Sequence, residues 1–134
     1  MIHMANQIKL VFDNQFHGIL TGHHGAARVG PEEGALAAYD MVLGGLAACL
    51  NHTFQTVLDK KRLSFHAVKY DITGEKRTEV PTTLKTVVVN IEVTGAPEEK
   101  QEQFRKAMAI ATEHCSVFVT LSHVAKMTWN IRFI

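Results

Sequence analysis

Two cysteines are the residues of this chain whose type and placement suit covalent chemistry. Cys49 follows a run of small and apolar residues, and Cys115 follows Glu113-His114. Two cysteines are too few for the disulfide framework of a small secreted domain. In a reducing compartment such a pair is more often redox-active or catalytic than structural. The pair therefore indicates thiol chemistry, and an inert, buried thiol is the alternative for Cys49.

Either thiol reacts only when it is ionised, because the thiolate is the nucleophile. A free thiol with a pKa near about 8.5 is only a few per cent ionised at pH 7. We expect Cys115 to open a short helix, whose unpaired N–H groups would lower the pKa of its thiol. Cys49 is expected in an apolar helix, where it would stay protonated unless a cation compensates.

The chain has 8 histidines, which raises a metal-binding alternative. Cys49 and His52 are about one helical turn apart, and His114 with Cys115 would complete a set of two cysteines and two histidines. The usual two-residue spacing between ligands is missing, and adjacent ligands rarely point at one ion. We therefore expect no metal and no cofactor, and zinc binding by a structural dimer remains an alternative.

The cysteines must be positioned by helices. Apolar residues recur at spacings of three and four over residues 38–60, which predicts one long helix. Small residues on its other side, such as Gly44 and Ala48, suggest that this helix is buried from both sides. Proline and two acidic residues from Pro97 onward suit the start of a second helix. A short third helix is expected over residues 116–124.

Strands are expected before and after the long helix. Aliphatic and aromatic runs or alternating apolar residues predict them at 8–12, 16–20, 66–72, 87–93 and 127–133. The first two form a hairpin, and the glycine-rich residues 21–34 are typical of a loop or a broken strand. This order predicts a single α+β domain over residues 1–134, with largely antiparallel sheets and a long buried central helix.

Composition narrows the class of partner. The chain has 134 residues, of which 46% are apolar and 20% charged, as in globular proteins. The net charge of +1 gives no field that would attract nucleic acid or an anionic membrane. The first nine residues lack a signal-peptide pattern, and the apolar residues 35–50 fall short of the roughly 20 needed to span a bilayer. We expect a cytoplasmic protein.

The surroundings of both cysteines resemble those of a known family. Residues 40–50 read DMVLGGLAACL, and residues 113–122 read EHCSVFVTLS. Together with the order of elements, these two segments resemble the OsmC/Ohr superfamily of osmotically inducible and organic hydroperoxide resistance proteins. The resemblance implies an OsmC-like fold, an intertwined homodimer with sites at its interface, and a thiol-dependent peroxidase of the oxidative stress response.

The resemblance also implies residue roles. Cys49 would be the peroxidatic residue, attacking an organic hydroperoxide, and more weakly hydrogen peroxide, to give a sulfenic acid. Cys115 would then form a disulfide with it, and an external dithiol, such as a lipoylated protein, would reduce the pair. Arg28 lies close to where this family carries its activating arginine. Asp40 stands where the family has an orienting glutamate, and Glu32 or Glu33 are alternative partners of Arg28.

The substrate pocket would be apolar. Its candidate walls are Leu46, Leu50, Phe54, Phe118 and Val119, each of which is equally explained as core. The chain departs from the family pattern at Ser116, where proline is usual, in its shorter N-terminal half, and in having His52 and His114 beside the cysteines. A thiol-reactive ligand binder or redox sensor with little turnover is therefore a further alternative.

Overall fold

The computed structural model of the protein describes residues 5–134. The first four residues, which belong to the segment inspected for a signal peptide and to the predicted domain, lie outside the described residues. The chain forms two compact units, Met1–Val42 and Leu43–Ile134. Each unit contains a sheet of its own, and a single domain over residues 1–134 stays a prediction.

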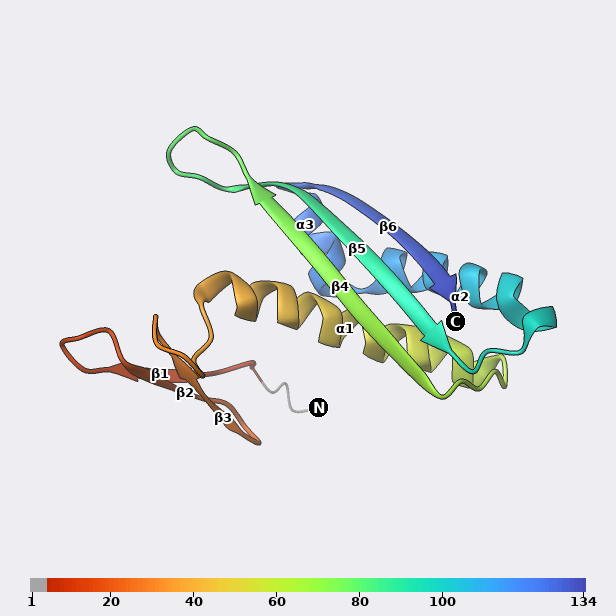
Figure 1. The fold of residues 1–134 in the computed structure, drawn as a ribbon, viewed down its shortest axis with the longest axis horizontal. Helices are drawn as coiled ribbons and strands as arrows, with labels where there is room; N and C mark the ends of the chain where they lie inside the picture. The colour runs from red at the N-terminus through yellow and green to blue at the C-terminus, as the bar shows by residue number, and fades with distance from the viewer. Residues whose placement is uncertain (1–4) are drawn as a thin grey trace. The chain divides into compact units, whose positions relative to one another are not determined.

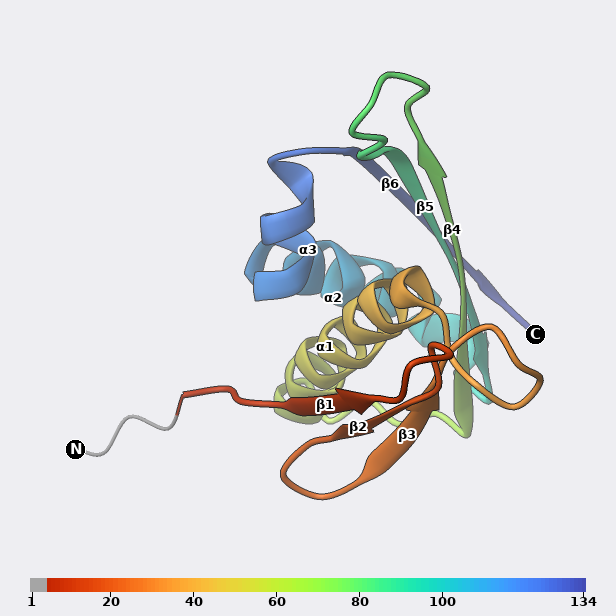
Figure 2. The ribbon, with the colours of Figure 1, turned by 90° about the vertical axis from the view of Figure 1, so that its left-hand side faces the viewer.

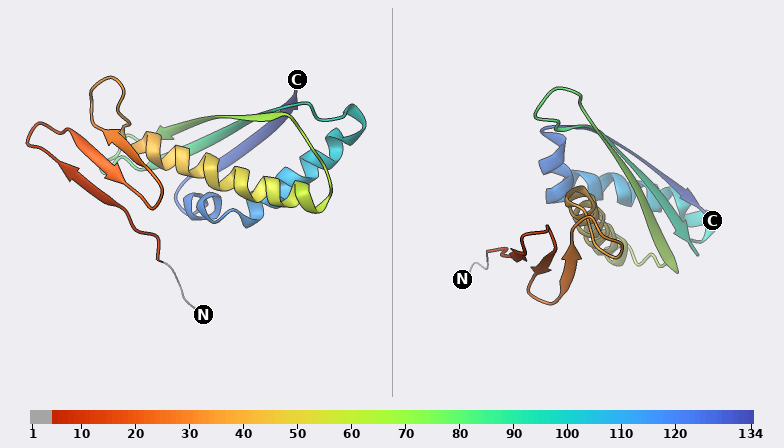
Figure 3. Two further views of the ribbon diagram at one scale, coloured as in Figure 1. Left: turned by 90° about the horizontal axis from the view of Figure 1, so that it is seen from below. Right: turned by 60° about the vertical axis from the view of Figure 1, so that its left-hand side comes forward.

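The first unit contains a three-stranded antiparallel sheet, visible in the left view of Figure 3. Its strands are β1 (Lys9–Phe12), β2 (Gly18–Thr21) and β3 (Ala26–Val29). The predicted hairpin is confirmed, and of the two alternatives for residues 21–34, a loop or a broken strand, the strand is found at Ala26–Val29 (β3). The four residues of β3 read AARV and have little intrinsic strand preference, so pairing with β2 makes this strand.

Helix α1 (Ala38–Lys60) has the predicted bounds. The carboxylate of Asp40 accepts a hydrogen bond from the backbone N–H of Ala37 at 2.8 Å, which satisfies a donor that the helix start leaves free. The fully buried residues of α1 recur every fourth position: Leu46, Leu50, Phe54 and Leu58. This spacing defines one buried stripe along the helix.

The opposite side of α1 is uncovered within this chain. Gly44, Gly45 and Ala48 are exposed, and a Cβ added at either glycine would meet nothing within 4 Å. The expectation that α1 is buried from both sides is therefore wrong for the single chain. The residues are small enough for another backbone to approach closely, but no element of the second unit does so.

The second unit is a mixed three-stranded sheet with helices on one face (Figures 1 and 2). Its strands are β4 (Ala67–Lys76), β5 (Leu84–Thr94) and β6 (Lys126–Phe133). Strands β4 and β5 pair antiparallel, as expected, whereas β5 and β6 pair parallel. A parallel pair needs a crossover connection, which consists of the 3₁₀ turn η1 (Glu98–Lys100), α2 (Gln101–His114) and α3 (Ser116–Ser122).

The core lies between the helices and the sheet. Alternate residues of β5 face the helices and are fully buried: Val87, Val89, Ile91 and Val93. The ring of Phe104 on α2 packs edge-on against Phe54 and Phe133, joining α1, α2 and β6. The opposite face of the sheet is polar, with Lys69, Glu92 and Arg132 in one row across the strands. This packing holds α1 against α2 and the sheet.

By length and composition alone, α1 is apolar enough to cross a bilayer. The expectation that the apolar residues 35–50 are too short for a span is corrected, because the whole helix of 23 residues meets the criterion. This is weak support for a membrane span, since the core helix of a globular protein satisfies the same criterion. The fully buried stripe of α1 is the mark of such a core helix.

Candidate active site

The two cysteines, 66 positions apart in the sequence, meet in the second unit. Cys49 lies in the middle of α1 and is half-buried, whereas Cys115 is fully buried. Cys115 is the N-cap residue of α3, and its Sγ accepts a hydrogen bond from the N–H of Phe118 at 3.5 Å. The two thiols are near enough for each to shift the pKa of the other. The expected cysteine pair therefore exists in the folded chain.

Ser116 is a member of this site that the sequence did not identify. Its Oγ lies 3.8 Å from the Sγ of Cys49, within hydrogen-bonding range of a sulfur atom. The sequence showed Ser116 only as a departure from the proline usual in the related family. Its position directly after Cys115, at the first turn of α3, was the available signal, because that turn is where a helix offers free donors.

The surroundings of Cys49 favour its thiolate. Partial burial raises the pKa of the Cys49 thiol, but four donors outweigh this effect and leave the pKa below its usual value. They are the backbone N–H of Val117, the thiol of Cys115, and the hydroxyl and backbone N–H of Ser116. Hydrogen bonds to the charged form of an acid favour that form. Cys49 is therefore ionised more readily than a free cysteine.

The surroundings of Cys115 have the opposite effect. Burial, together with the neighbouring Cys49, raises the pKa of the Cys115 thiol to about 11, against the opposing effect of the N–H groups of Phe118 and Val117. The N–H groups at the helix start do act to lower the pKa of Cys115, but burial outweighs them, so the expectation of a lowered pKa is wrong in its net direction. The first N–H groups of α3 point at the sulfur of Cys49 as well, and Cys49 is the less buried of the two. The pair thus consists of one thiol that ionises readily and one that stays protonated at neutral pH.

A tyrosine from the sheet lies close to the buried cysteine. The hydroxyl of Tyr70, on β4, donates a hydrogen bond to Oδ1 of Asn51 on α1 at 3.1 Å. Burial raises the pKa of the Tyr70 hydroxyl well above its usual value, and the negative charge that Cys115 can carry raises it further. Tyr70 therefore remains protonated and holds α1 against the sheet within two residues of Cys49.

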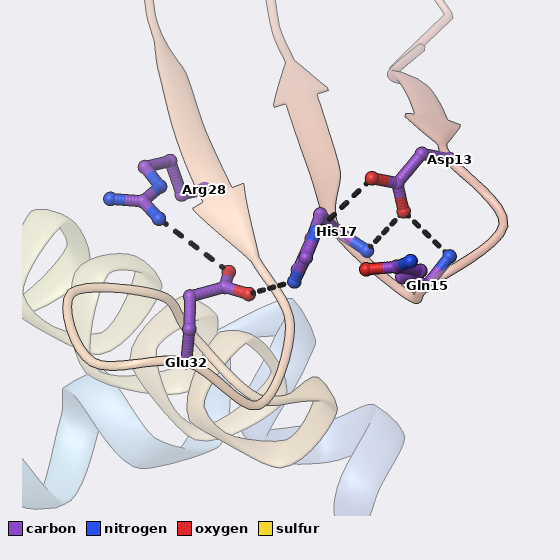
Figure 4. A network of polar contacts seen from close by, with 5 residues as sticks. All are labelled: Asp13, Gln15, His17, Arg28 and Glu32. Atoms are coloured by element: carbon purple, nitrogen blue, oxygen red, sulfur yellow. Dashed lines mark hydrogen bonds and ion pairs between the residues drawn. The ribbon is translucent and has the colours of Figure 1, made fainter.

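Arg28 belongs to the first unit, on β3. Its Nη2 lies 3.9 Å from Oε1 of Glu32, and the side chain of Arg28 is 58% exposed. Figure 4 shows Glu32 placed between Arg28 and His17. Asp40, the other candidate partner, uses its carboxylate at the start of α1. The proposed roles of Arg28 and Asp40 toward Cys49 stay predictions.

The predicted pocket residues fall into two groups. Leu46, Leu50 and Phe54 are fully buried in the core, whereas Phe118 is half-buried and Val119 is 39% exposed. Their role as pocket walls stays a prediction. Across residues 5–134, no group of three or more histidine, cysteine, aspartate or glutamate side chains is arranged to hold a metal ion. The zinc alternative therefore finds no ligand set in the described chain.

Solved structures share this arrangement of elements. An OsmC-like protein from Mycoplasma pneumoniae superposes with a TM-score of 0.82 at 17% identity, covering 99% of both chains. An organic hydroperoxide resistance protein OsmC from Legionella pneumophila gives 0.71 at 14% identity, covering 98% of both. The organic hydroperoxide resistance protein OhrB of Bacillus subtilis gives 0.67 at 13%, covering 96% of this chain and 98% of that one. At such identities the likeness shows the fold.

No curated protein matches this chain in sequence. The OsmC-like protein family, however, matches residues 30–130, which include all of α1, both cysteines and nearly the whole second sheet. The structure has the α+β arrangement of the solved OsmC-like proteins, with two small sheets and a central helix. The chain therefore belongs to the OsmC-like protein family of the OsmC/Ohr superfamily.

Proposed function

We propose that this protein is a thiol-dependent peroxidase that reduces organic hydroperoxides and, more weakly, hydrogen peroxide. The observation that supports it most is the asymmetry of the cysteine pair: Cys49 has a lowered pKa and Cys115 a raised one. A peroxidase of this type needs a thiolate to attack the peroxide and a thiol to resolve the product. The family, and the likeness to proteins named for organic hydroperoxide resistance, support a peroxide-related role.

The reaction proceeds in three balanced steps. The Cys49 thiolate attacks one peroxide oxygen, the O–O bond breaks, and the alcohol leaves after taking up one proton, so that Cys49 carries a sulfenic acid. The sulfur of Cys115 then displaces the sulfenic hydroxyl, which leaves as water with the Cys115 proton, and a Cys49–Cys115 disulfide remains. An external dithiol, such as a lipoyl group, reduces this disulfide by exchange and is itself oxidised to a disulfide.

The buried state of Cys115 suits the second step. Its thiol stays protonated at neutral pH, so it does not compete with Cys49 for the peroxide. Once the negative charge on Cys49 is consumed, one of the influences that raise the Cys115 pKa is removed. The resolving thiol thus becomes easier to ionise after the sulfenic acid has formed. Disulfide formation by Cys115 therefore follows the attack of Cys49 on the peroxide.

We further propose a cytoplasmic homodimer whose two sites are shared between subunits. Helix α1 runs without a break from Ala38, so Asp40 and Cys49 are about 13–14 Å apart along its axis and on opposite sides. An arginine cannot contact both groups of one straight helix. Antiparallel α1 helices from two subunits, crossing at the uncovered glycine and alanine face, would bring the two ends together.

A dithiol-coupled assay tests the proposal. Purified protein would be mixed with hydrogen peroxide, tert-butyl hydroperoxide or a fatty-acid hydroperoxide, with dithiothreitol or dihydrolipoamide as reductant. We expect many turnovers and preference for the organic peroxides. Loss of free thiol in a single stoichiometric reaction, with no further turnover, would instead indicate a redox sensor. Unchanged free thiol would contradict both functions.

A further inference from the structure

We propose that Glu32, held by His17, is the carboxylate that orients Arg28, and that Asp40 does not have this role. The inference rests on the proposed function, in which Arg28 activates Cys49 and the peroxide. It is built from a network within the first unit, shown in Figure 4, that connects the β1–β2 turn to the loop after β3. Glu32 and His17 are positioning residues, because they act through Arg28.

The carboxylate of Glu32 is held from two sides. Its Oε1 lies 3.9 Å from Nη2 of Arg28, and its Oε2 lies 3.3 Å from Nε2 of His17. Oε2 is fully buried and accepts no hydrogen bond in the described residues, so its contact with His17 is its main polar contact. A buried carboxylate oxygen without a donor is unfavourable. A proton on Nε2 of His17 would supply the missing donor.

The ring of His17 is held in turn by the carboxylate of Asp13, which backbone N–H groups fix in place. Its Nδ1 lies 3.1 Å from Oδ2 of Asp13, and Oδ1 of Asp13 accepts hydrogen bonds from the N–H groups of Gln15 and His17 at 2.8 and 2.9 Å. The N–H of His17 and that of Gln15 lower the pKa of Asp13, so this carboxylate is charged. An imidazole between two carboxylates donates to both only when it is doubly protonated. The charged groups that face His17 are Asp13 and Glu32. Arg28 lies on the other side of Glu32.

The backbone leaves space for this arrangement at one glycine. Gly30 has a φ of 155°, and a Cβ added there would lie 2.7 Å from the carbonyl oxygen of Phe16 and 2.8 Å from Oε1 of Glu32. Any side chain at this position would displace the Glu32 carboxylate. The close approach shows that Glu32 folds back over the loop instead of extending into solvent.

The two other acidic candidates lack such contacts with Arg28. The carboxylate of Asp40 is engaged by the N–H of Ala37 at the start of α1. Glu33 is exposed, and its side chain makes no ion pair or hydrogen bond with any other residue of the described range 5–134. Glu33 is therefore a matched control for Glu32, since it is the neighbouring residue with the same charge and length.

The test is a double-mutant cycle on kcat/KM for an organic hydroperoxide, with thermal unfolding as a check of folding. Glu32→Gln should lower kcat/KM about 2- to 5-fold, as expected for loss of a partly exposed ion pair. His17→Gln should have a smaller effect in the same direction, and Glu33→Gln none. In an Arg28→Met background, Glu32→Gln should have no further effect, because it acts through Arg28.

The outcomes separate this inference from the proposed function. A slow Arg28→Met protein together with unchanged Glu32→Gln would overturn the role of Glu32 alone. An equal effect of Glu32→Gln with and without Arg28 would also overturn it, since the effect would then be structural. Normal activity of Arg28→Met, or no activity of the unmodified protein, would overturn the proposed role of Arg28 and this inference with it. Loss of the Arg28 dependence in Asp40→Asn would assign the role to Asp40 instead.

Discussion

Replacement of Ser116 by alanine tests the geometry at Cys49 directly. The change removes a hydroxyl 3.8 Å from the Cys49 sulfur and leaves the backbone N–H groups of α3 in place. A donor lost from the thiolate raises the pKa of Cys49, because the charged form loses stabilisation and the protonated form does not. Reactivity of Cys49 at neutral and mildly acidic pH should therefore fall.

The size of the effect follows from the contact. A hydrogen bond contributes about 0.5–1.5 kcal/mol net, which corresponds to about a 2- to 12-fold change in the thiolate fraction below the pKa. The contact between Ser116 and Cys49 is open to solvent, which weakens it. We therefore expect about a 2- to 5-fold lower rate at pH values below the pKa, and no difference well above it.

The measurement is the rate of Cys49 alkylation by iodoacetamide from pH 5 to 10, in a Cys115→Ser background so that one thiol reacts. Ser116→Thr keeps the hydroxyl and should keep the rate. Ser122→Ala removes a serine at the other end of α3, whose hydroxyl donates to the carbonyl of Val119, and should leave the profile unchanged. If Ser116→Ala has the same profile as its parent, the hydroxyl does not stabilise the thiolate.

Four further changes test the remaining roles. Cys49→Ser should abolish peroxide consumption, whereas Cys115→Ser should consume about one equivalent and stop as a sulfenic acid; retained turnover in Cys49→Ser would show that another group is the nucleophile. Arg28→Met should lower kcat/KM on the order of 10²-fold and slow the alkylation of Cys49 at neutral pH; an unchanged alkylation profile would exclude Arg28 as the activating cation. Mixing Arg28→Met with Cys49→Ser should restore activity in mixed dimers by rebuilding one shared site, and mixed dimers that form but stay inactive would contradict shared sites. Asp40→Ala should lower the free energy of unfolding by about 0.5–1 kcal/mol through loss of the bond to Ala37, seen as a lower Tm, and an unchanged Tm would show that this bond does not stabilise α1.

The sequence predicted the elements that carry their own hydrophobic pattern. Helix α1 was predicted with the bounds it has, because its apolar stripe extends over many turns. For β3 the sequence left a loop and a broken strand open, because four residues of mostly small side chains show no hydrophobic alternation; pairing with β2 decides the conformation. The parallel pairing of β6 with β5 depends on where the crossover helices place the chain. The local sequence pattern of β6 does not predict this direction.

In the candidate site, too, some features could be predicted from the local sequence and others depend on the folded chain. The cysteine pair could be found from local context, since both segments resemble a known family. The direction of each pKa could not, because it depends on which thiol is buried and on which sulfur the first N–H groups of α3 approach. The contact of Ser116 with Cys49 likewise joins positions 67 residues apart, and only the folded chain brings them together.

The placement of the two cysteines on α1 and at the start of α3 has a consequence for the unfolded chain. The segment between them contains β4, β5 and α2, so the proposed disulfide would close a loop that includes about half of the protein. Closing a loop of this size lowers the conformational entropy of the unfolded chain and so raises the free energy of unfolding by about 4 kcal/mol. In a chain of this length, that increase corresponds to a Tm higher by roughly 10–20 °C. The oxidised form, which would accumulate when peroxide exceeds reductant, would then be the form that best resists unfolding and proteolysis. Each reduction by a dithiol would return the enzyme to its active and less stable state.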